Sequence, residues 1–526
     1  MKKIIVIGAG LAGLSAAKEA AERGTGSILV SDQPSERAQS VLAQGGINAA
    51  SYMEDGDSVQ SHYEDTLAGG ADLADPEALQ GLTAAAPRIV EELAGLGVPF
   101  HREDGRIAWR GLGGQKKKRA AYAQKSTGKT LVTALADEVR KYEASGLVER
   151  MPHHKFAGLY LKDGECRGCF VRDTYTGDAV FLEGPVLLAC GGLNGMFGEQ
   201  TTGSRSNTGE AAATVFRQGV ELGNLEFVQY HPTTFSIPGK RCLVSEAARG
   251  EGGRLFVKRK GVPWYFMEEK YPSFGNLMPR DVVSREMAAV CEGDGCERQV
   301  YLDMAGVSPG AWKKGLAELK TECMKYLHID PEKEPVPVEP GVHYFMGGIL
   351  ADRNHRTNIR YVYVAGECAC QYHGANRLGG NSMLGAIYGG KVAARSAVGD
   401  LTEWQGVKSI PAIPEWEEDR TDMETVSGCL AEGMGIVRSG EKISCAVRKL
   451  EELWNRAEKG GKQENRLLLG LAMLRSADER KESRGAHFRS DYPEADEGYR
   501  KTTVAVFDGK RIRISFRDIA GKESDE

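Results

Sequence analysis

Four short motifs set a histidine or an arginine among small and apolar residues. His231 lies in EFVQYHPT, Arg280 in PRDVVSR, His343 in HYFMGG and Arg377 in HGANRLGGNS. Planar guanidinium groups match carboxylates better than ammonium groups do, and histidine can donate a hydrogen bond or change its charge near neutral pH. Taken singly, each residue also fits a structural role, for example an ion pair of Arg280 with Asp281. Together they are candidates for a site that binds carboxylate groups.

The elements that must position these residues begin with a strand, a glycine turn and a helix. KKIIVIGAG is followed by LAGLSAAKEAAERG and then by SILVSD, so that Gly8, Gly10 and Gly13 form G-x-G-x-x-G between a strand and a helix. Glycines in this context let the backbone approach a pyrophosphate at the helix N-terminus. An ordinary glycine turn is the alternative. At the end of the second strand, the aligned position holds Ser31, with Asp32 next to it, and either could meet a ribose hydroxyl.

Two further segments favour FAD over NAD as the dinucleotide. SERAQSVLAQGG, from Ser35 to Gly46, is a loop of small residues that can lie flat along a planar ring, and YVAGE ends at Glu367, far along the chain. FAD-binding chains bring such a distant segment back to the flavin. The predicted cofactor is therefore FAD.

The predicted fold class is α/β. Apolar runs at Pro185–Gly192 and Ile359–Glu367 end in small residues, as the first strand does, and we expect the three to share one parallel sheet. The predicted architecture is a Rossmann-like FAD-binding domain made of residues 1–233 and 343–400, an inserted α+β capping domain at 234–342, and a C-terminal helical domain with a short strand-like tail at 412–526.

Composition narrows the class of protein. The 526 residues carry a formal net charge of -5, which gives no general attraction for nucleic acid despite the local run KKKR at 116–119. No apolar run approaches the length of a membrane span, and no signal peptide precedes the first strand, so we expect a cytoplasmic protein. The 11 cysteines lack the paired spacing of a zinc or iron–sulfur site, so we expect no bound metal.

With SEAARGEGG at 245–253, the motifs occur in an order and spacing that specify a family. The chain resembles the flavoprotein subunits of fumarate reductase and succinate dehydrogenase and the related L-aspartate oxidases, over nearly its whole length. The resemblance implies a C4 dicarboxylate as substrate. It assigns one carboxylate to Arg377 and His343, and the other to His231 and Ser245.

The resemblance also implies a mechanism. Fumarate would be reduced to succinate by hydride transfer from flavin N5, and Arg280 would protonate the other carbon. Glu246 and Arg249 would resupply that proton. The FAD contacts that the resemblance adds to those named above are Gln44, Gly45, Gly46, Glu210, Glu367, Ser382 and Met383.

Departures from the family pattern bear on the subgroup. Gln39 stands where membrane-complex members typically carry the histidine that links FAD, which predicts noncovalent FAD. Thr130 stands where L-aspartate oxidases commonly carry a glutamate that pairs with the substrate amino group, and this favours a dicarboxylate without an amine. Lys129 and Ser245 leave another 2-enoate open as the substrate.

L-aspartate oxidase therefore remains the alternative function, with L-aspartate oxidised to iminoaspartate. Since the chain lacks cluster ligands, its electrons must come from or go to another molecule, and the resemblance suggests an iron–sulfur electron-transfer subunit. Any contact with a membrane would then be made through partner subunits.

Overall fold

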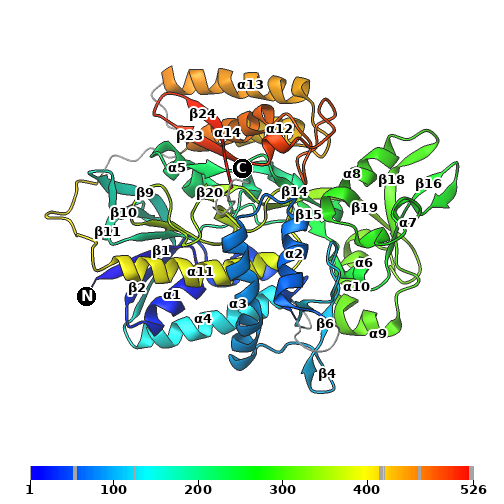
Figure 1. Ribbon diagram of the computed structural model, residues 1–526, viewed down its shortest axis with the longest axis horizontal. Helices are drawn as coiled ribbons and strands as arrows, with labels where there is room; N and C mark the ends of the chain where they lie inside the picture. The colour runs from blue at the N-terminus through cyan, green and yellow to red at the C-terminus, as the bar shows by residue number, and fades with distance from the viewer. Residues whose placement is uncertain are drawn as a thin grey trace, which may run out of the picture.

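A five-stranded parallel sheet organises the first part of the protein (Figure 1). The computed structural model describes residues 2–50, 56–123, 126–413, 419, 421–459 and 464–519. The sheet order is β21 (Val362–Val364), β12 (Val186–Leu188), β1 (Lys3–Ile7), β2 (Gly26–Ser31) and β8 (Val148–Pro152). It confirms that the three predicted apolar runs pair in one sheet, as the shared burial of such strands favours.

Helices cover this sheet, and glycine sets how closely two of them approach. Helix α1 (Leu11–Glu22) packs on α11 (Asn381–Asp400), with α4 (Thr127–Ala144) and α3 (Pro76–Gly95) beside them and α2 (Val59–Gly69) against α3 (Figure 1). A Cβ atom at Gly390 of α11 would lie 2.2 Å from the carbonyl oxygen of Ala12 in α1. The two helix backbones therefore meet at a position that only glycine fits.

Smaller sheets flank the parallel one. An antiparallel sheet has the order β11 (Ala179–Glu183), β10 (Glu165–Asp173) and β9 (His154–Lys162), with α5 (Glu210–Arg217) against β9. A second three-stranded sheet is formed by β3 (Ile47–Asn48), β7 (Ala120–Ala121) and β6 (Trp109–Arg110), and β4 (Arg102–Glu103) pairs with β5 (Arg106–Ile107).

A six-stranded antiparallel sheet forms the capping part on the right of Figure 1. Its order is β15 (Lys240–Leu243), β14 (Val228–Ile237), β19 (Val336–Phe345), β18 (Cys296–Asp303), β16 (Arg254–Arg259) and β17 (Val262–Trp264). Its helices are α6 (Ala247–Gly250), α7 (Phe266–Lys270), α8 (Arg280–Cys291), α9 (Pro309–Ala311) and α10 (Ala317–Glu322).

The expected domain junctions at 233/234 and 342/343 fall inside β14 and β19, which pair with each other. The connections between the two parts are thus continuous strands. His231 and His343, one on each strand, lie at this crossing.

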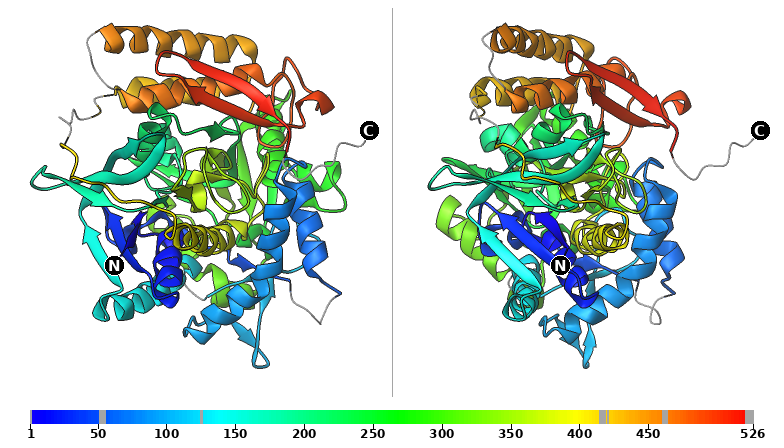
Figure 2. Two further views of the ribbon diagram at one scale, coloured as in Figure 1. Left: turned by 60° about the vertical axis from the view of Figure 1, so that its left-hand side comes forward. Right: turned by 90° about the vertical axis from the view of Figure 1, so that its left-hand side faces the viewer.

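The C-terminal part adds helices α12 (Met423–Gly433), α13 (Gly440–Lys459) and α14 (Asn465–Glu479). They lie on one side of the molecule in every view, beside the two final strands (Figure 1, Figure 2). Strands β23 (Thr502–Phe507) and β24 (Ile512–Arg517) extend a sheet with β22 (Ala369–Cys370), β20 (Gly348–Leu350) and β13 (Leu222–Gly223). The tail of the chain is therefore paired with strands that precede the helices.

No helix of the described residues combines the length and apolar character needed to cross a membrane. Within the same residues, no group of three or more His, Cys, Asp or Glu side chains is arranged to hold a metal ion.

Candidate active site

A cavity of about 690 Å³ lies between the part built on the parallel sheet and the capping part, and brings most of the predicted residues together. At one end it is lined by residues of the glycine turn and the loops around it, and at the other by buried charged residues. The predicted residues that line it are Gly8, Gly10, Ser31, Gln44, Gly45, Gly46, Glu210, His231, Ser245, Glu246, Arg280, His343, Glu367, Arg377, Ser382 and Met383. Gly13 and Arg249 are not on its wall. Gly13 lies behind it against Gly8, and Arg249 contacts Glu246, which is on the wall.

Backbone builds the dinucleotide end of the cavity. Gly8 has a φ of +113°, and a Cβ atom there would lie 2.2 Å from the carbonyl oxygen of Ala189. A Cβ atom at Gly13 would lie 1.8 Å from the carbonyl oxygen of Gly8, so Gly13 lets α1 start directly against the turn. Gly10 is the N-cap residue of α1. The bare turn and the helix N-terminus fit the pyrophosphate of a dinucleotide.

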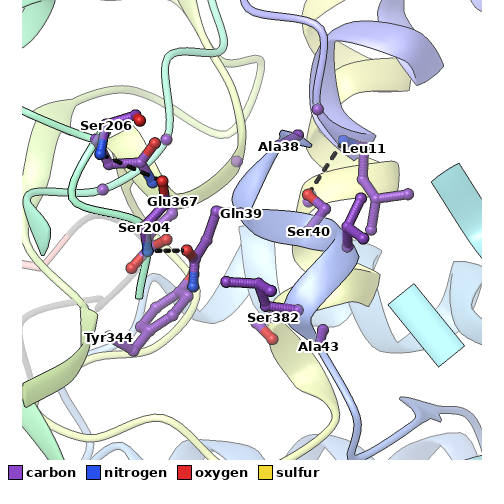
Figure 3. Close-up of a pocket in the computed structure, with 18 of the residues that line it drawn as sticks. Leu11, Ala38, Gln39, Ser40, Ala43, Ser204, Ser206, Tyr344, Glu367 and Ser382 are labelled. Carbon is purple, nitrogen blue, oxygen red and sulfur yellow. Dashed lines mark hydrogen bonds between the residues drawn. The ribbon is translucent and has the colours of Figure 1, made fainter. Parts of the chain in front are cut away.

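Figure 3 shows the loop that carries Gln39 and Ser40 beside Leu11, the first residue of α1. The side chain of Ser40 accepts a hydrogen bond from the backbone N–H of Leu11 at 3.3 Å, which ties the loop to α1. The side-chain oxygen of Gln39 accepts a hydrogen bond from the backbone N–H of Ser204. Gln39 therefore joins its own loop to the segment that follows Thr201.

Buried polar groups line the cavity farther along. Glu367 accepts a hydrogen bond from the backbone N–H of Phe345 at 3.2 Å, and burial raises the pKa of its carboxyl to about 7. Ser382 and Met383 stand in the first turn of α11. The N-cap of that helix is Gly380, where a Cβ atom would lie 2.1 Å from the side-chain oxygen of Asn48. These groups fit the polyol chain and ring of a flavin, which need hydrogen bonds and a closely approaching backbone.

A buried chain of two arginines and a glutamate marks the other end. Arg280, the first residue of α8, donates to Glu246 Oε2 from Nη2 at 2.7 Å. Arg249 donates to Glu246 Oε1 from Nη2 at 3.3 Å, and to the backbone oxygen of Asn276 from Nη1 at 2.5 Å. Burial opposes the charge of Glu246, but Arg280 and Arg249 outweigh it and lower the pKa of its carboxyl to about 2. The glutamate is thus ionised between two guanidinium groups.

Gln229 holds Arg280 and Arg377 side by side. Its side-chain oxygen accepts from Arg280 Nη1 at 3.1 Å and from Arg377 Nη2 at 3.0 Å. Its side-chain nitrogen donates to the backbone oxygen of Arg377 at 2.7 Å. The Arg377 guanidinium also lies 4.3 Å from the centre of the Tyr344 ring, a cation–π contact.

The two histidines meet near these arginines. The ring centres of His231 and His343 lie 5.1 Å apart at an interplanar angle of 64°. Burial, followed by the charge of Arg280, lowers the pKa of both rings well below its usual value. Both rings are therefore neutral near pH 7.

The charges at this end do not balance. Arg249, Arg280 and Arg377 surround a single carboxylate, that of Glu246, which leaves a formal surplus of two positive charges in the cluster. Burial lowers the pKa of Arg377 to about 9 and that of Arg249 to about 10, so both stay charged at neutral pH. Among the described residues, Nε of Arg280 and Nε of Arg377 have no hydrogen-bond partner. A buried surplus of positive charge with unpaired N–H donors fits a ligand that carries two negative charges.

The motif residues predicted from the sequence come together, whereas Gln229 was missed. It precedes His231 by two positions on β14, and residues that alternate along a strand share one face. That period is the signal that would have found it. Thr130, by contrast, lies off the wall, with its hydroxyl donating to the backbone oxygen of Thr127 at 2.8 Å, whereas Lys129 does line the cavity.

Comparisons with known proteins agree with this geometry. Residues 3–383 match the FAD binding domain family and residues 459–524 match the fumarate reductase flavoprotein C-terminal family. The chain is 38% identical to the succinate dehydrogenase flavoprotein subunit of Bacillus subtilis, over 95% of this chain and 93% of that protein. It is 35% identical to an L-aspartate oxidase of Mesorhizobium japonicum, over 94% of this chain and 92% of that protein.

The fold is also similar to that of a solved E. coli quinol fumarate reductase chain, with a TM-score of 0.88, 28% identity and coverage of 99% of this chain and 98% of the other. The protein is thus an FAD-binding oxidoreductase, and it belongs to the family of the flavoprotein subunits of succinate dehydrogenase and fumarate reductase and of the L-aspartate oxidases.

Proposed function

We propose that the protein reduces fumarate to succinate. The observation that carries this proposal is the buried cluster of Arg280, Glu246, Arg249 and Arg377 at one end of the cavity, which has a formal surplus of two positive charges. Fumarate brings two negative charges and an unsaturated bond that can accept a hydride and a proton. The surplus is neutralised only when both carboxylates are bound.

The substrate would lie between two sets of side chains. Arg377 and His343 hold one carboxylate, and His231 and Ser245 hold the other. All four residues line the same cavity, which supports this assignment. Holding both carboxylates fixes the double bond in one orientation, and orientation alone can lower a reaction barrier by several kcal/mol.

The reaction adds a hydride to one carbon and a proton to the other. FAD, when bound in its reduced form, would supply the hydride. Arg280 supplies the proton from its guanidinium group, because it reaches the cavity wall and contacts Glu246 at 2.7 Å. Glu246 then passes a proton from Arg249 to Arg280. A positioned proton donor of this kind contributes about 10² to 10⁴-fold to a rate.

FAD is bound without a covalent link in this proposal. Gln39 stands at the position of the linking histidine, and a carboxamide nitrogen does not form that bond. Its side chain accepts a hydrogen bond from the Ser204 backbone, which supports a structural role for Gln39 in joining two loops of the cavity. Acid precipitation should leave the flavin in the supernatant, and yellow colour retained in the pellet would contradict this point.

L-aspartate fits the site less well than fumarate does. Its ammonium group needs a free carboxylate beside the bound acid, but Glu246, the carboxylate of the arginine cluster, is already shared by Arg249 and Arg280. Thr130 lies off the cavity wall and has no carboxyl group. An unmet charged hydrogen bond costs about 1.5 to 3 kcal/mol. Lys129 also lines the cavity, and its presence leaves another 2-enoate open as the substrate.

The electrons must be delivered by another molecule, and an iron–sulfur subunit in the cytoplasm is the partner we propose. The test of the reaction itself does not need that partner. Reduced viologen dye can supply electrons while succinate formation from fumarate is measured. Succinate formed in proportion to dye oxidation is the expected result. No dye oxidation with fumarate, together with reduction of the oxidised flavin by L-aspartate, would overturn the proposal.

A further inference from the structure

We propose that Thr202 is a positioning residue for His343, whose ring it holds with the N–H on Nε2. This inference rests on the proposed function for its consequence, because His343 is the ring that we assign to a substrate carboxylate. The Thr202 hydroxyl oxygen lies 2.8 Å from His343 Nδ1. Both side chains line the cavity, yet they come from segments about 140 residues apart.

A hydroxyl can donate to Nδ1 or accept from it, so the direction of this bond must be settled by the other acceptors in reach. Among the described residues, the one other oxygen within hydrogen-bond distance of the Thr202 hydroxyl is the backbone oxygen of Val342, at 3.4 Å. That oxygen already accepts from the backbone N–H of Thr202 at 2.9 Å and from the Thr201 hydroxyl at 3.1 Å. Two donors fill the two lone pairs of a carbonyl oxygen.

The Thr201 hydroxyl does not release its position on Val342. Its oxygen accepts from the side chain of Asn194 at 3.0 Å and from the backbone N–H of Gly203 at 3.0 Å, so its own proton is the one directed at Val342. The Thr202 proton therefore goes to His343 Nδ1. Donation to Nδ1 requires a lone pair there, and in a neutral imidazole the proton then sits on Nε2.

The segment that carries Thr202 is held by hydrogen bonds on both sides. Asn194 also donates to the backbone oxygen of His343 at 3.3 Å, and Gln39 holds the backbone of Ser204. The threonine is thus clamped between the strand that carries His343 and the loop that carries Gln39. A hydroxyl held in this way selects one tautomer and one ring orientation.

The consequence concerns how a neutral ring can hold an anion. Burial and the charges of Arg280, His231 and Arg377 lower the pKa of His343, so a neutral ring must hold a carboxylate by a hydrogen bond alone. Only the Nε2–H tautomer offers a donor at Nε2, and the hydrogen bond of this ring among the described residues is made at Nδ1. The other tautomer would present a lone pair to the carboxylate and repel it.

The tautomer can be read without any substrate. The holoprotein with ¹⁵N-labelled histidine gives separate signals for protonated and unprotonated ring nitrogens, and His343→Gln identifies those of His343 among the 10 histidines. We expect a protonated Nε2 and an unprotonated Nδ1 in the wild type, and a mixture of tautomers in Thr202→Val. A protonated Nδ1 in the wild type, or no change in the variant, overturns the inference.

Dicarboxylate binding tests the consequence separately. Malonate, which cannot be reduced, is titrated while the flavin spectrum is followed. Thr202→Val should weaken malonate binding about five- to tenfold, the equivalent of one hydrogen bond, and raise KM for fumarate more than it lowers kcat. Thr202→Ser, which keeps the hydroxyl, should restore binding to within about twofold.

Two controls separate positioning from a general structural role. FAD content and the melting temperature of Thr202→Val should match the wild type. In a His343→Ala background the change at Thr202 should add nothing, because its effect acts through that ring. An equal loss in both backgrounds would overturn the inference. If the tautomer pattern holds but the wild type neither binds malonate nor reduces fumarate, the proposed function fails while the inference about the ring stands.

Discussion

The two ends of the cavity differ in what lines them: one is lined mainly by backbone and the other by side chains. The dinucleotide end consists of backbone, with glycines at Gly8 and Gly13 where no side chain fits. The substrate end consists of buried charged side chains that are held by neighbours from distant segments. Gln229, for example, accepts hydrogen bonds from both Arg280 and Arg377. A backbone site fails when atoms are added, whereas a side-chain site fails when atoms are removed. The same protein thus has two opposite sensitivities to mutation.

The largest effect should come from removing Arg280. Arg280→Ala takes away the proposed proton donor and one partner of Glu246, and fumarate-dependent flavin reoxidation should slow by about 10³-fold or more. The variant should still bind FAD, because the dinucleotide end is untouched. Arg285→Lys, in the same helix, is the matched control and should reoxidise at the wild-type rate. Normal turnover in Arg280→Ala would reject the donor assignment.

Glu246→Gln should slow the same reaction by about 10²-fold, since the proton can no longer return through a carboxylate. Its pH dependence is the sharper measurement. The wild-type carboxyl is ionised at all pH values above about 2, so this loss should not be recovered between pH 6 and 8. A variant that regains the wild-type rate anywhere in that range would show that the proton comes by another route.

The opposite end should respond to an added methyl group. Gly8→Ala forces a positive φ on alanine and a clash with the backbone of Ala189, which together cost about 3 kcal/mol, or roughly 100-fold in FAD affinity. The ratio of flavin absorbance to protein after dialysis measures this. Gly95→Ala, where a Cβ atom meets nothing within 4 Å, is the control that should keep its flavin. Equal FAD content in both variants would contradict the backbone account.

Acid should weaken the fold through the buried histidines. The pKa of His231 and of His343 is lower in the folded protein than the ordinary 6.5, so the unfolded chain takes up protons first as the pH falls. Stability is therefore full above about pH 6.5 and falls below it, by up to about 1.4 kcal/mol per pH unit for each ring. Glu246 adds a further loss below about pH 4.5, where the unfolded carboxyl protonates.

Melting temperatures at pH 7.5 and pH 5.5 measure this loss. The double variant His231→Gln, His343→Gln should lose less stability than the wild type over that interval. Four further histidines are buried with a lowered pKa and keep part of the slope in the variant: His62, His355, His373 and His487. A steeper slope in the double variant would reverse the sign that we assign.

The smallest effect should be that of Thr130→Val. The Thr130 hydroxyl bonds to its own helix and does not line the cavity, so fumarate turnover should stay within about twofold of the wild type. Steady-state rates with the viologen dye check this. A large loss would place Thr130 in the site after all.

The sequence predicted the backbone end well because its signals are local. The glycine spacing, the strand before it and the helix after it lie within one short segment, and the structure confirms the strand–helix–strand order. The parallel sheet also followed from its apolar runs. The junctions of the capping part were harder to predict. Pro232, Pro340 and Gly341 stand beside the expected borders, yet β14 and β19 continue through them as strands.

The side-chain end was predictable only in part. Motifs pointed to Arg280, His343 and Arg377, but their relation depends on contacts across more than 100 residues. Gln229 lies inside a motif and two positions from His231, but nothing in the sequence shows that it joins two arginines. Thr202 lies outside the quoted motifs, and its role follows from which acceptors around it are already filled. Which acceptors are already occupied is decided by the folded structure and cannot be read from the sequence.

The most direct test of the central claim compares acids of different charge. The flavoprotein is reduced chemically without oxygen and mixed with fumarate or with crotonate, which has the same double bond but one carboxylate. Rapid return of the oxidised-flavin absorbance with fumarate and a rate lower by about 10²-fold or more with crotonate is the predicted result. Equal rates, or no return with fumarate together with flavin reduction by L-aspartate in the oxidised protein, would contradict it.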